Sequence, residues 1–259
     1  MTNCSKGILA LAYLATTVGA CSSFGVVDPP GGGEPADASA GDASDVPFCA
    51  AHASATLCRD FDPPARVDDG WTGTELLGGG AVLASNAESA GGAQSLHSVV
   101  ARSPELSSRG RLYQDVASAR PRTRLSFDIK IRTPAIIGTG ELSVAELLCT
   151  TAGVNDGAWL YYHASSVGPV FGVETERGSR FAQLSAPTDS WTHYEVDAHW
   201  SRDLLVIRVD GGAPTRIPMA SSCANAPNAR VNIGLATING SYAVDAFFDN
   251  VLYEELAEE

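Results

Sequence analysis

Hydrophobic and polar residues alternate along most of the chain beyond Phe61, with a period of two residues rather than the roughly 3.6 of a helix. The clearest run is Leu125–Arg132, in which apolar residues fall on one face and polar residues on the other. His193–Trp200 and Leu205–Asp210 repeat the pattern, and the second runs into the turn-forming pair Gly211-Gly212. A half-buried strand requires this alternation, so we predict a strand in each run.

Weaker alternation predicts further strands along the chain. They are expected at Leu96–Ala101, Leu112–Val116, Leu142–Leu148, Trp159–His163, Val170–Glu174, Val231–Ala236 and Tyr242–Tyr253. No window between them shows a sustained helical stripe with caps. Many short strands separated by Gly, Pro, Asn and Ser turns predict an all-β sandwich or barrel.

The N-terminal segment follows a different pattern. Lys6 precedes the apolar run Ile8–Ala15, which is too short to span a bilayer, and small residues then lead to a cysteine. Val18-Gly19-Ala20-Cys21 resembles the lipobox of bacterial lipoproteins. The resemblance implies a signal peptide at residues 1–20, acylation of Cys21 and anchoring in the cell envelope. The Ser22 that follows favours the outer membrane, and a plain secretory signal ending in a chance cysteine is the alternative.

We predict that residues 21–47 comprise the acylated cysteine and a disordered tether. The stretch is rich in Gly, Pro, Ala and Ser, with five acidic residues and no basic ones, so it cannot bury enough apolar surface to fold. Residues 48–259 remain for one all-β domain, large enough to bury a core without cofactors. The formal net charge of −13 argues against nucleic acid as a partner.

The cysteines fit export to an oxidising compartment. Cys4 is removed with the predicted signal peptide and Cys21 is predicted to be acylated, which leaves Cys49, Cys58, Cys149 and Cys223. Of the three pairings that four cysteines allow, we favour a short Cys49–Cys58 clip and a long Cys149–Cys223 bridge. Their spacings do not suit a zinc site.

The last third of the chain contains a succession of predicted strand segments: Trp191–Val196, Leu205–Gly211, Val231–Leu235 and Phe247–Tyr253. Their order resembles the concanavalin-A-like jelly roll. Laminin-G-like modules, legume lectins and family 16 glycoside hydrolases share that fold. The resemblance covers Leu57–Glu254 and implies a two-sheet antiparallel jelly-roll sandwich. It implies little about function, because such folds host many activities.

The glycosidases of that fold carry their catalytic carboxylates as Glu-x-Asp-x-x-Glu on one strand, and this chain lacks the motif. Retaining hydrolysis needs two carboxylates roughly 5 Å apart. Glu141 and Glu146, five residues apart, should point to opposite faces of a strand. Glu174 and Glu176 share a face beside a turn, where two solvated acids are the simpler explanation. The chain also lacks Gly-x-Ser-x-Gly and His-Glu-x-x-His, so we expect the domain to be non-catalytic.

Calcium is the one cofactor that the resemblance suggests. Glycosidases of this fold often hold a structural Ca²⁺ through an Asp-x-Val-x-Tyr motif, which matches Asp249–Tyr253. We therefore predict that Asp249 binds Ca²⁺, with Asp60 or Asp62 beside it if the two ends of the domain pair, since Ca²⁺ prefers oxygen ligands. The alternative is that Asp249 accepts backbone hydrogen bonds at a strand bend.

Trp159, Tyr161 and His163 are our candidate ligand-binding residues. They alternate along one predicted strand and so share a face. Aromatic rings exposed in this way can stack on sugar rings, whereas packing in the core is the alternative.

Two polar clusters have simpler explanations than a binding site. His193, Glu195, Asp197 and His199 share a strand face but spread over roughly 20 Å, so at most two neighbours could form half of a metal site. Otherwise the face meets solvent or ligand. A second cluster holds eight of the seventeen basic residues, and it would suit anionic glycan or lipopolysaccharide phosphate if it formed one patch. It lies between Arg102 and Arg132 and includes Arg109, Arg111, Arg120, Arg122 and Arg124.

Three functions remain open on these grounds. The leading one is a lipid-anchored envelope protein whose domain binds glycan or another extracellular ligand without catalysis. The second is a polysaccharide-active hydrolase or lyase with a non-standard site, and the third is an adhesion module that packs against an envelope protein. An exposed aromatic row would favour the first, a cleft with converging carboxylates the second, and a flat apolar patch the third.

Overall fold

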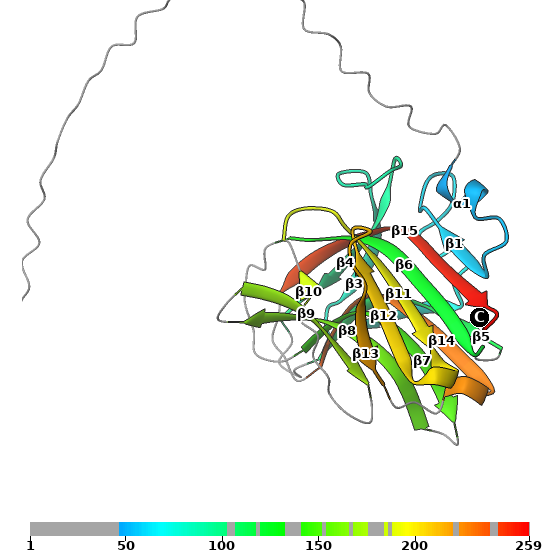
Figure 1. Cartoon of the computed structure of the whole chain (residues 1–259). Helices are drawn as coiled ribbons and strands as arrows, with labels where there is room; N and C mark the ends of the chain where they lie inside the picture. Colours follow the sequence, from blue (N-terminus) through cyan, green and yellow to red (C-terminus); the bar gives the residue numbers. More distant parts are fainter. Residues whose placement is uncertain are drawn as a thin grey trace, which may run out of the picture. The chain divides into compact units, whose positions relative to one another are not determined.

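A computed structural model describes residues 47–102, 107–117, 120–132, 141–151, 154–165, 168–175, 184–185, 188–219, 223–238 and 243–258. These residues form two antiparallel β-sheets stacked on one another (Figure 1). The predicted signal peptide, Cys21 and the tether up to residue 46 lie outside the described residues. Within the described part of the chain, no helix is long and apolar enough to cross a membrane.

The first sheet, called sheet A, contains both ends of the described domain. Its strands are all antiparallel to their neighbours. In spatial order they are β13 (Thr215–Pro218), β12 (Leu204–Val209), β11 (Thr192–His199), β6 (Arg122–Ile131), β15 (Val244–Leu256), β4 (Ser95–Val100) and β3 (Ala81–Ser85). The short strand β1 (Leu57–Arg59) pairs with β15, so the chain enters and leaves the domain side by side.

The second sheet, called sheet B, is also antiparallel throughout its described strands. In spatial order they are β10 (Leu184–Ser185), β9 (Gly168–Thr175), β8 (Val154–Ser165), β7 (Glu141–Thr151), β14 (Asn228–Ile238), β5 (Ser108–Val116) and β2 (Gly73–Leu77). Short helical turns lie at the ends of strands: α1 (Phe48–Ala51), η1 (Trp200–Arg202) and η2 (Cys223–Asn225). The predicted two-sheet antiparallel fold is therefore confirmed.

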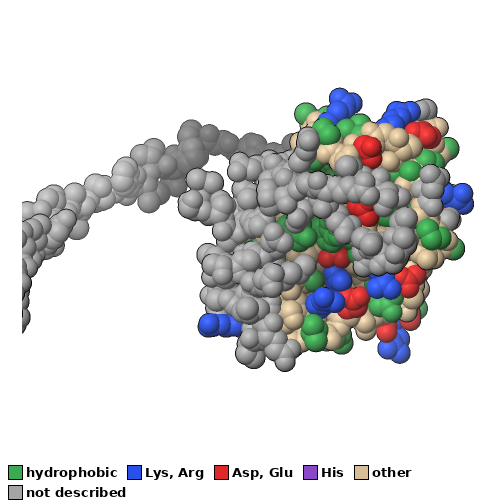
Figure 2. Space-filling view, turned by 90° about the horizontal axis from the view of Figure 1, so that it is seen from below, with side chains coloured by type: hydrophobic (Ala, Val, Ile, Leu, Met, Phe, Trp, Pro, Cys, Tyr) green, Lys and Arg blue, Asp and Glu red, His purple; other side chains and the backbone are tan. Residues whose placement is uncertain are grey.

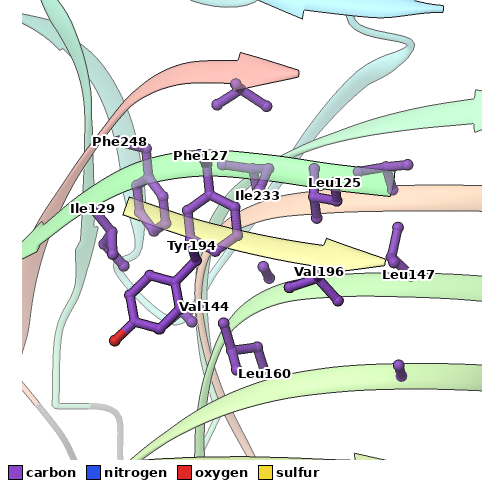
Figure 3. Packing of buried hydrophobic residues seen from close by; sticks show 14 of the residues in the cluster. Leu125, Phe127, Ile129, Val144, Leu147, Leu160, Tyr194, Val196, Ile233 and Phe248 are labelled. Carbon is purple, nitrogen blue, oxygen red and sulfur yellow. The ribbon is translucent and has the colours of Figure 1, made fainter. Parts of the chain in front are cut away.

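The core lies between the inner faces of the two sheets. Leu125, Phe127 and Ile129 of β6 are almost completely buried, and the intervening residues of the strand are on the outer face. Sheet B contributes Leu147, Leu160, Ile233 and others to the same cluster, as Figure 3 shows. The alternation read from the sequence thus matches burial in the sandwich.

Both favoured disulfides are present. Cys49–Cys58 ties α1 to β1, and Cys149–Cys223 joins β7 to η2 across a sequence separation of 74 residues. The sulfur-bearing residues of the long bridge are fully buried, at 1% and 0% exposure. The long bridge therefore crosslinks distant segments inside the core.

Candidate functional site

A cleft of about 870 Å³ lies on the outer face of sheet B. Its described lining comes from five neighbouring strands, β2, β5, β14, β7 and β8, and from the segment after β5. The charged and amide side chains in it are Glu75, Arg109, Arg111, Asp115, Glu146, Asn228, Arg230 and Asn232, with Trp159 on β8. Figure 2 shows one face of the domain, on which acidic and basic side chains gather close together.

Strand alternation and register place these side chains together. Core residues such as Leu112, Leu147 and Leu160 face inward, so their strand neighbours face the cleft. β5 pairs with β14, β14 with β7, and β7 with β8. The register of these pairs aligns four outward residues in one row: Tyr113, Asn232, Glu146 and Trp159. The row is therefore built from segments far apart in the sequence.

A register shift in β14 lies next to this row. The shift falls between Ile233 and Ala236 against β7. Gly234, inside it, has φ of 120°, a conformation that side-chain-bearing residues rarely adopt. A Cβ atom there would also lie 2.6 Å from the carbonyl oxygen of Gly110, so glycine is required for the close approach of β14 and β5.

Glu146 is the centre of the hydrogen-bond network on the cleft floor. Its side chain is only 4% exposed, and Oε1 accepts hydrogen bonds from Arg111 Nη1 at 2.6 Å and Ser143 Oγ at 2.7 Å. Oε2 accepts a hydrogen bond from Asn232 Nδ2 at 2.6 Å. Burial of a carboxylate is tolerated when it is paired and hydrogen-bonded in this way.

Glu75 links three arginines at the β2 side of the cleft. Its Oε2 lies 2.8 Å from Arg111 Nη2 and 3.4 Å from Arg109 Nη1, and its Oε1 lies 3.2 Å from Arg230 Nη1. Burial raises the pKa of the Glu75 carboxyl, but the three guanidinium groups outweigh it and hold the pKa below the ordinary 4.5. Glu75 is therefore ionised at neutral pH.

Arg230 on β14 is fixed by a second acid and an aromatic ring. Its Nε lies 2.6 Å from Asp115 Oδ1, and its guanidinium carbon lies 4.2 Å from the centre of the Tyr113 ring. The hydrogen bond that Arg230 donates to Asp115 raises the pKa of Arg230 above its ordinary value, against the effect of burial. The cleft wall is thus a rigid ion-pair network rather than a set of free charges.

Two of the three candidate residues, Trp159 and Tyr161, fall on the outer face of sheet B, as the alternation predicts. Trp159 is partly exposed, lies outside the core cluster and lines the cleft. Tyr161 also lies outside the core cluster but is 4% exposed. The side chain of His163 lies outside the described residues. Of the three, Trp159 is the residue that the structure places at the cleft.

The acidic pairs considered from the sequence lie partly outside the described residues. Glu146 is on the cleft floor, whereas the side chain of Glu141 is not described. Glu174 pairs in register with Trp159, but its side chain and the whole of Glu176 are outside the described residues. The two described glutamates of the cleft are instead Glu75 and Glu146, bridged by Arg111.

Asp249, the predicted calcium ligand, is fully buried and hydrogen-bonded to the backbone. Its Oδ2 accepts from the amides of Ala90 at 2.9 Å and Gly91 at 3.4 Å, and its Oδ1 accepts from the amide of Asn250 at 2.9 Å. Burial raises the pKa of Asp249 to about 6, the backbone donors offset part of this, and the nearby Asp128 carboxylate adds to it. This is the alternative arrangement considered for Asp249.

The other two predicted calcium ligands have similar partners. Asp62 Oδ1 accepts from the backbone amides of Ala93 at 2.5 Å and Gln94 at 3.0 Å, and Asp60 Oδ1 lies 3.5 Å from the amide of Asp62. N–H donors around a carboxylate do not fit the oxygen shell that Ca²⁺ requires. No group of three or more His, Cys, Asp or Glu side chains in the described ranges could hold a metal ion. The calcium site stays a prediction.

The pKa of Asp249 implies a pH-dependent stability. We expect the free energy of unfolding to decrease as the pH rises from about 4 to about 6, because the folded chain keeps a proton that the unfolded chain releases near 3.8. A folded-state pKa of about 6 corresponds to roughly 3 kcal/mol lost above pH 6. Urea unfolding at four pH values between 4 and 7 would measure it.

Asp249→Asn cannot ionise, so this part of the pH dependence should disappear in the variant. Asp68→Asn is the matched control, because Asp68 is a half-exposed surface acid paired with Arg66. If the free energy of unfolding of Asp249→Asn decreased with pH as steeply as that of the unmodified chain, another group would be the cause of the pH dependence.

The polar row of β11 lies on the outer face of sheet A and is paired across strands. His193 Nδ1 donates to Asp128 Oδ1 at 2.7 Å, and this hydrogen bond raises the pKa of His193 despite its partial burial. Asp197 accepts two hydrogen bonds from Arg122, from Nε to Oδ1 at 2.9 Å and from Nη2 to Oδ2 at 2.7 Å. Burial raises the pKa of Asp197, but Arg122 and its neighbours lower it overall. We assign no binding function to this row.

The basic cluster predicted between Arg102 and Arg132 is not one patch. Arg109 and Arg111 face the cleft on sheet B, whereas Arg122 and Arg124 contact Asp197 on sheet A. Arg120 pairs with Glu255. The simpler explanation, ordinary strands and loops, therefore fits better than a single anionic-ligand surface, because β5 and β6 are consecutive in sequence but belong to different sheets.

An adhesion module would be expected to have a flat apolar patch. Among the described residues, large exposed hydrophobic side chains occur only on the edge strands β2 and β3. The exposed large hydrophobic side chains are Leu76 and Leu77 of β2 and Leu83 of β3. Nothing in the structure indicates what would cover them.

The fold and the cleft together define an antiparallel jelly-roll domain with a polar groove across one sheet. The comparisons with solved structures agree with this fold. An endo-β-1,4-glucuronan lyase from the fungus Trichoderma reesei matches with a TM-score of 0.53 and 12% identity, over 78% of this chain and 96% of that one. The cellulose induced protein Cip1 matches with a TM-score of 0.53 and 14% identity, over 77% and 97%.

These matches show that the chain has the concanavalin-A-like jelly-roll fold that its strand order resembles. At such low identity they show the fold alone. No protein-family model matches the chain, and no curated protein sequence matches it.

Proposed function

We propose that the domain binds a polysaccharide in the cleft of sheet B without cleaving it. The observation that carries the proposal is the cleft itself, which combines Trp159 with a row of fixed hydrogen-bonding side chains. Its volume of about 870 Å³ lies in the range of ligand sites, roughly 300–1,000 Å³. An aromatic ring beside polar groups suits sugars, which have apolar ring faces and hydroxyl edges.

The state of the cleft carboxylates supports binding rather than hydrolysis. A cleft with carboxylates is what the enzyme alternative predicts, but an acid catalyst must stay protonated near neutral pH. The pKa of Glu75 is lowered by three arginines, and both oxygens of Glu146 accept hydrogen bonds. Glu75 is therefore not available as a general acid, and both oxygens of Glu146 already have hydrogen-bond partners within the protein.

Trp159→Ala is expected to weaken glycan binding by roughly 1–3 kcal/mol through lost ring stacking, by analogy with bases stacked on aromatic side chains. This corresponds to a dissociation constant about 5–150 times larger. A glycan array would identify the polysaccharide, and calorimetric titration would then measure the affinity of both chains.

Phe48→Ala is the control, since Phe48 lies in α1, on an element that does not line the cleft. Unchanged affinity in Trp159→Ala, with unfolding behaviour like that of the unmodified chain, would contradict the site. Release of reducing ends or of unsaturated sugars, abolished in Glu146→Gln, would favour the enzyme alternative.

We further propose that the domain is displayed on the cell envelope through acylation of Cys21. The Val18–Cys21 lipobox and the acidic tether behind it support this, and the two disulfides fit an exported domain. Palmitate labelling that persists in Cys21→Ser would contradict it.

A further inference from the structure

The charges of the cleft cancel within its described lining. Three arginines face three acids, and each guanidinium has at least one carboxylate partner within 3.4 Å. The pairs are Arg109–Glu75, Arg111–Glu75, Arg111–Glu146, Arg230–Glu75 and Arg230–Asp115. An anionic ligand would therefore find no unpaired guanidinium in this part of the cleft, and it would lie close to three carboxylates.

Among its described residues, the floor of the cleft has a polar side-chain atom without a partner. Asn232 is 1% exposed, and its Oδ1 has no hydrogen-bond donor. The amide orientation is fixed because Nδ2 donates to Glu146 Oε2, which as a carboxylate oxygen can only accept. A buried acceptor left unsatisfied costs roughly 1–3 kcal/mol, so a ligand that donates a hydrogen bond there gains affinity.

We propose that the cleft is selective for uncharged polysaccharides and that a sugar hydroxyl donates to Asn232 Oδ1. The inference rests on the proposed function and names the class of ligand. A sugar hydroxyl can donate a hydrogen bond to Asn232 Oδ1, whereas a uronate carboxylate can only accept hydrogen bonds. A uronate carboxylate in the cleft would face the acceptor Asn232 Oδ1 and the carboxylates of Glu146 and Glu75. Oδ1 is covered in the unliganded chain, so the hydroxyl reaches it after a small shift of lining side chains, a common change on binding.

The test compares sugars that differ only in charge. The purified chain is titrated with β-1,4-glucan and β-1,4-mannan hexasaccharides and with the same two chains oxidised to carboxylates at every C6. We expect each uncharged sugar that binds to do so roughly tenfold or more tightly than its oxidised counterpart, because like charges placed together cost several kcal/mol. Its affinity should change little with added salt.

Glu75→Gln probes the cause of the selectivity. The change keeps the shape of the side chain but removes one negative charge, which leaves the described lining with an excess of one positive charge. The preference for uncharged sugar should fall several-fold in this variant. Glu195→Gln is the control, because Glu195 pairs with Arg208 on sheet A, away from the cleft, and it should keep the full preference.

Equal or tighter binding of an oxidised sugar by the unmodified chain would overturn the inference, whatever the stability of the variant. It would leave the proposed function standing. Failure of all four sugars and of the glycan array to bind would instead contradict the proposed function, and the inference with it.

Discussion

Replacing Cys149 and Cys223 by serine is expected to destabilise the domain by roughly 4 kcal/mol, the loss that a chain-entropy model gives for a bridge of this length. The bridge spans 74 residues and joins β7 to η2, so the reduced unfolded chain gains much more freedom than the folded one. For a domain of this size each kcal/mol lowers the melting temperature by roughly 2–4 °C. Calorimetry on the double variant would therefore show a decrease of roughly 10 °C.

The Cys49→Ser/Cys58→Ser variant is the matched control. Its bridge spans only 9 residues, for which the same model gives roughly 3 kcal/mol. The long bridge also lies in the core, so its loss should have the larger effect. An equal or smaller loss in the Cys149/Cys223 variant would show that loop length does not determine the contribution of these bridges.

Arg111→Met should destabilise the domain by roughly 3–5 kcal/mol, because it leaves a buried carboxylate without its counter-charge. Glu146 is 4% exposed and Arg111 is its cationic partner at 2.6 Å. Methionine keeps much of the length of the side chain, so lost packing contributes little. Urea unfolding of the variant measures the effect.

Arg120→Met is the comparison for that result. Arg120 pairs with Glu255 at 3.0 Å but its side chain is 58% exposed, and such surface pairs contribute roughly 0–1 kcal/mol. Adding Glu146→Gln to Arg111→Met removes the unpaired charge and should restore part of the stability. A loss below about 1 kcal/mol in Arg111→Met would mean that Ser143 and Asn232 alone stabilise the Glu146 carboxylate.

The sequence predicted the strands that have one face in the core. Leu125–Arg132 and His193–Trp200 correspond closely to β6 and β11, because their inner residues are apolar and their outer residues polar. The edge strands β2 and β3 were missed. They have no fully buried residue, so no alternation marks them.

The candidate site was predicted only in part, for a related reason. Trp159 was found because a strand pattern shows which residues share a face. Glu75, Arg230 and Asn232 were missed, since their meeting depends on the order and register of β2, β5, β14 and β7. Register between strands distant in sequence is set by the packing of the whole sandwich. One feature of the sequence could have indicated Asn232 as a site residue: it is a polar residue between two core residues, Val231 and Ile233, and so lies on the outer face of its strand.

The pairing of β1 with β15 has a practical consequence for immobilising the protein. Leu57 is aligned with Tyr253, so the chain enters and leaves the domain at neighbouring points of sheet A (Figure 1). The cleft is on the outer face of sheet B, the opposite layer of the sandwich. A biosensor chip, a fluorophore or a fused reporter attached beyond β1 or β15 would therefore be linked to sheet A and not to a strand that lines the groove.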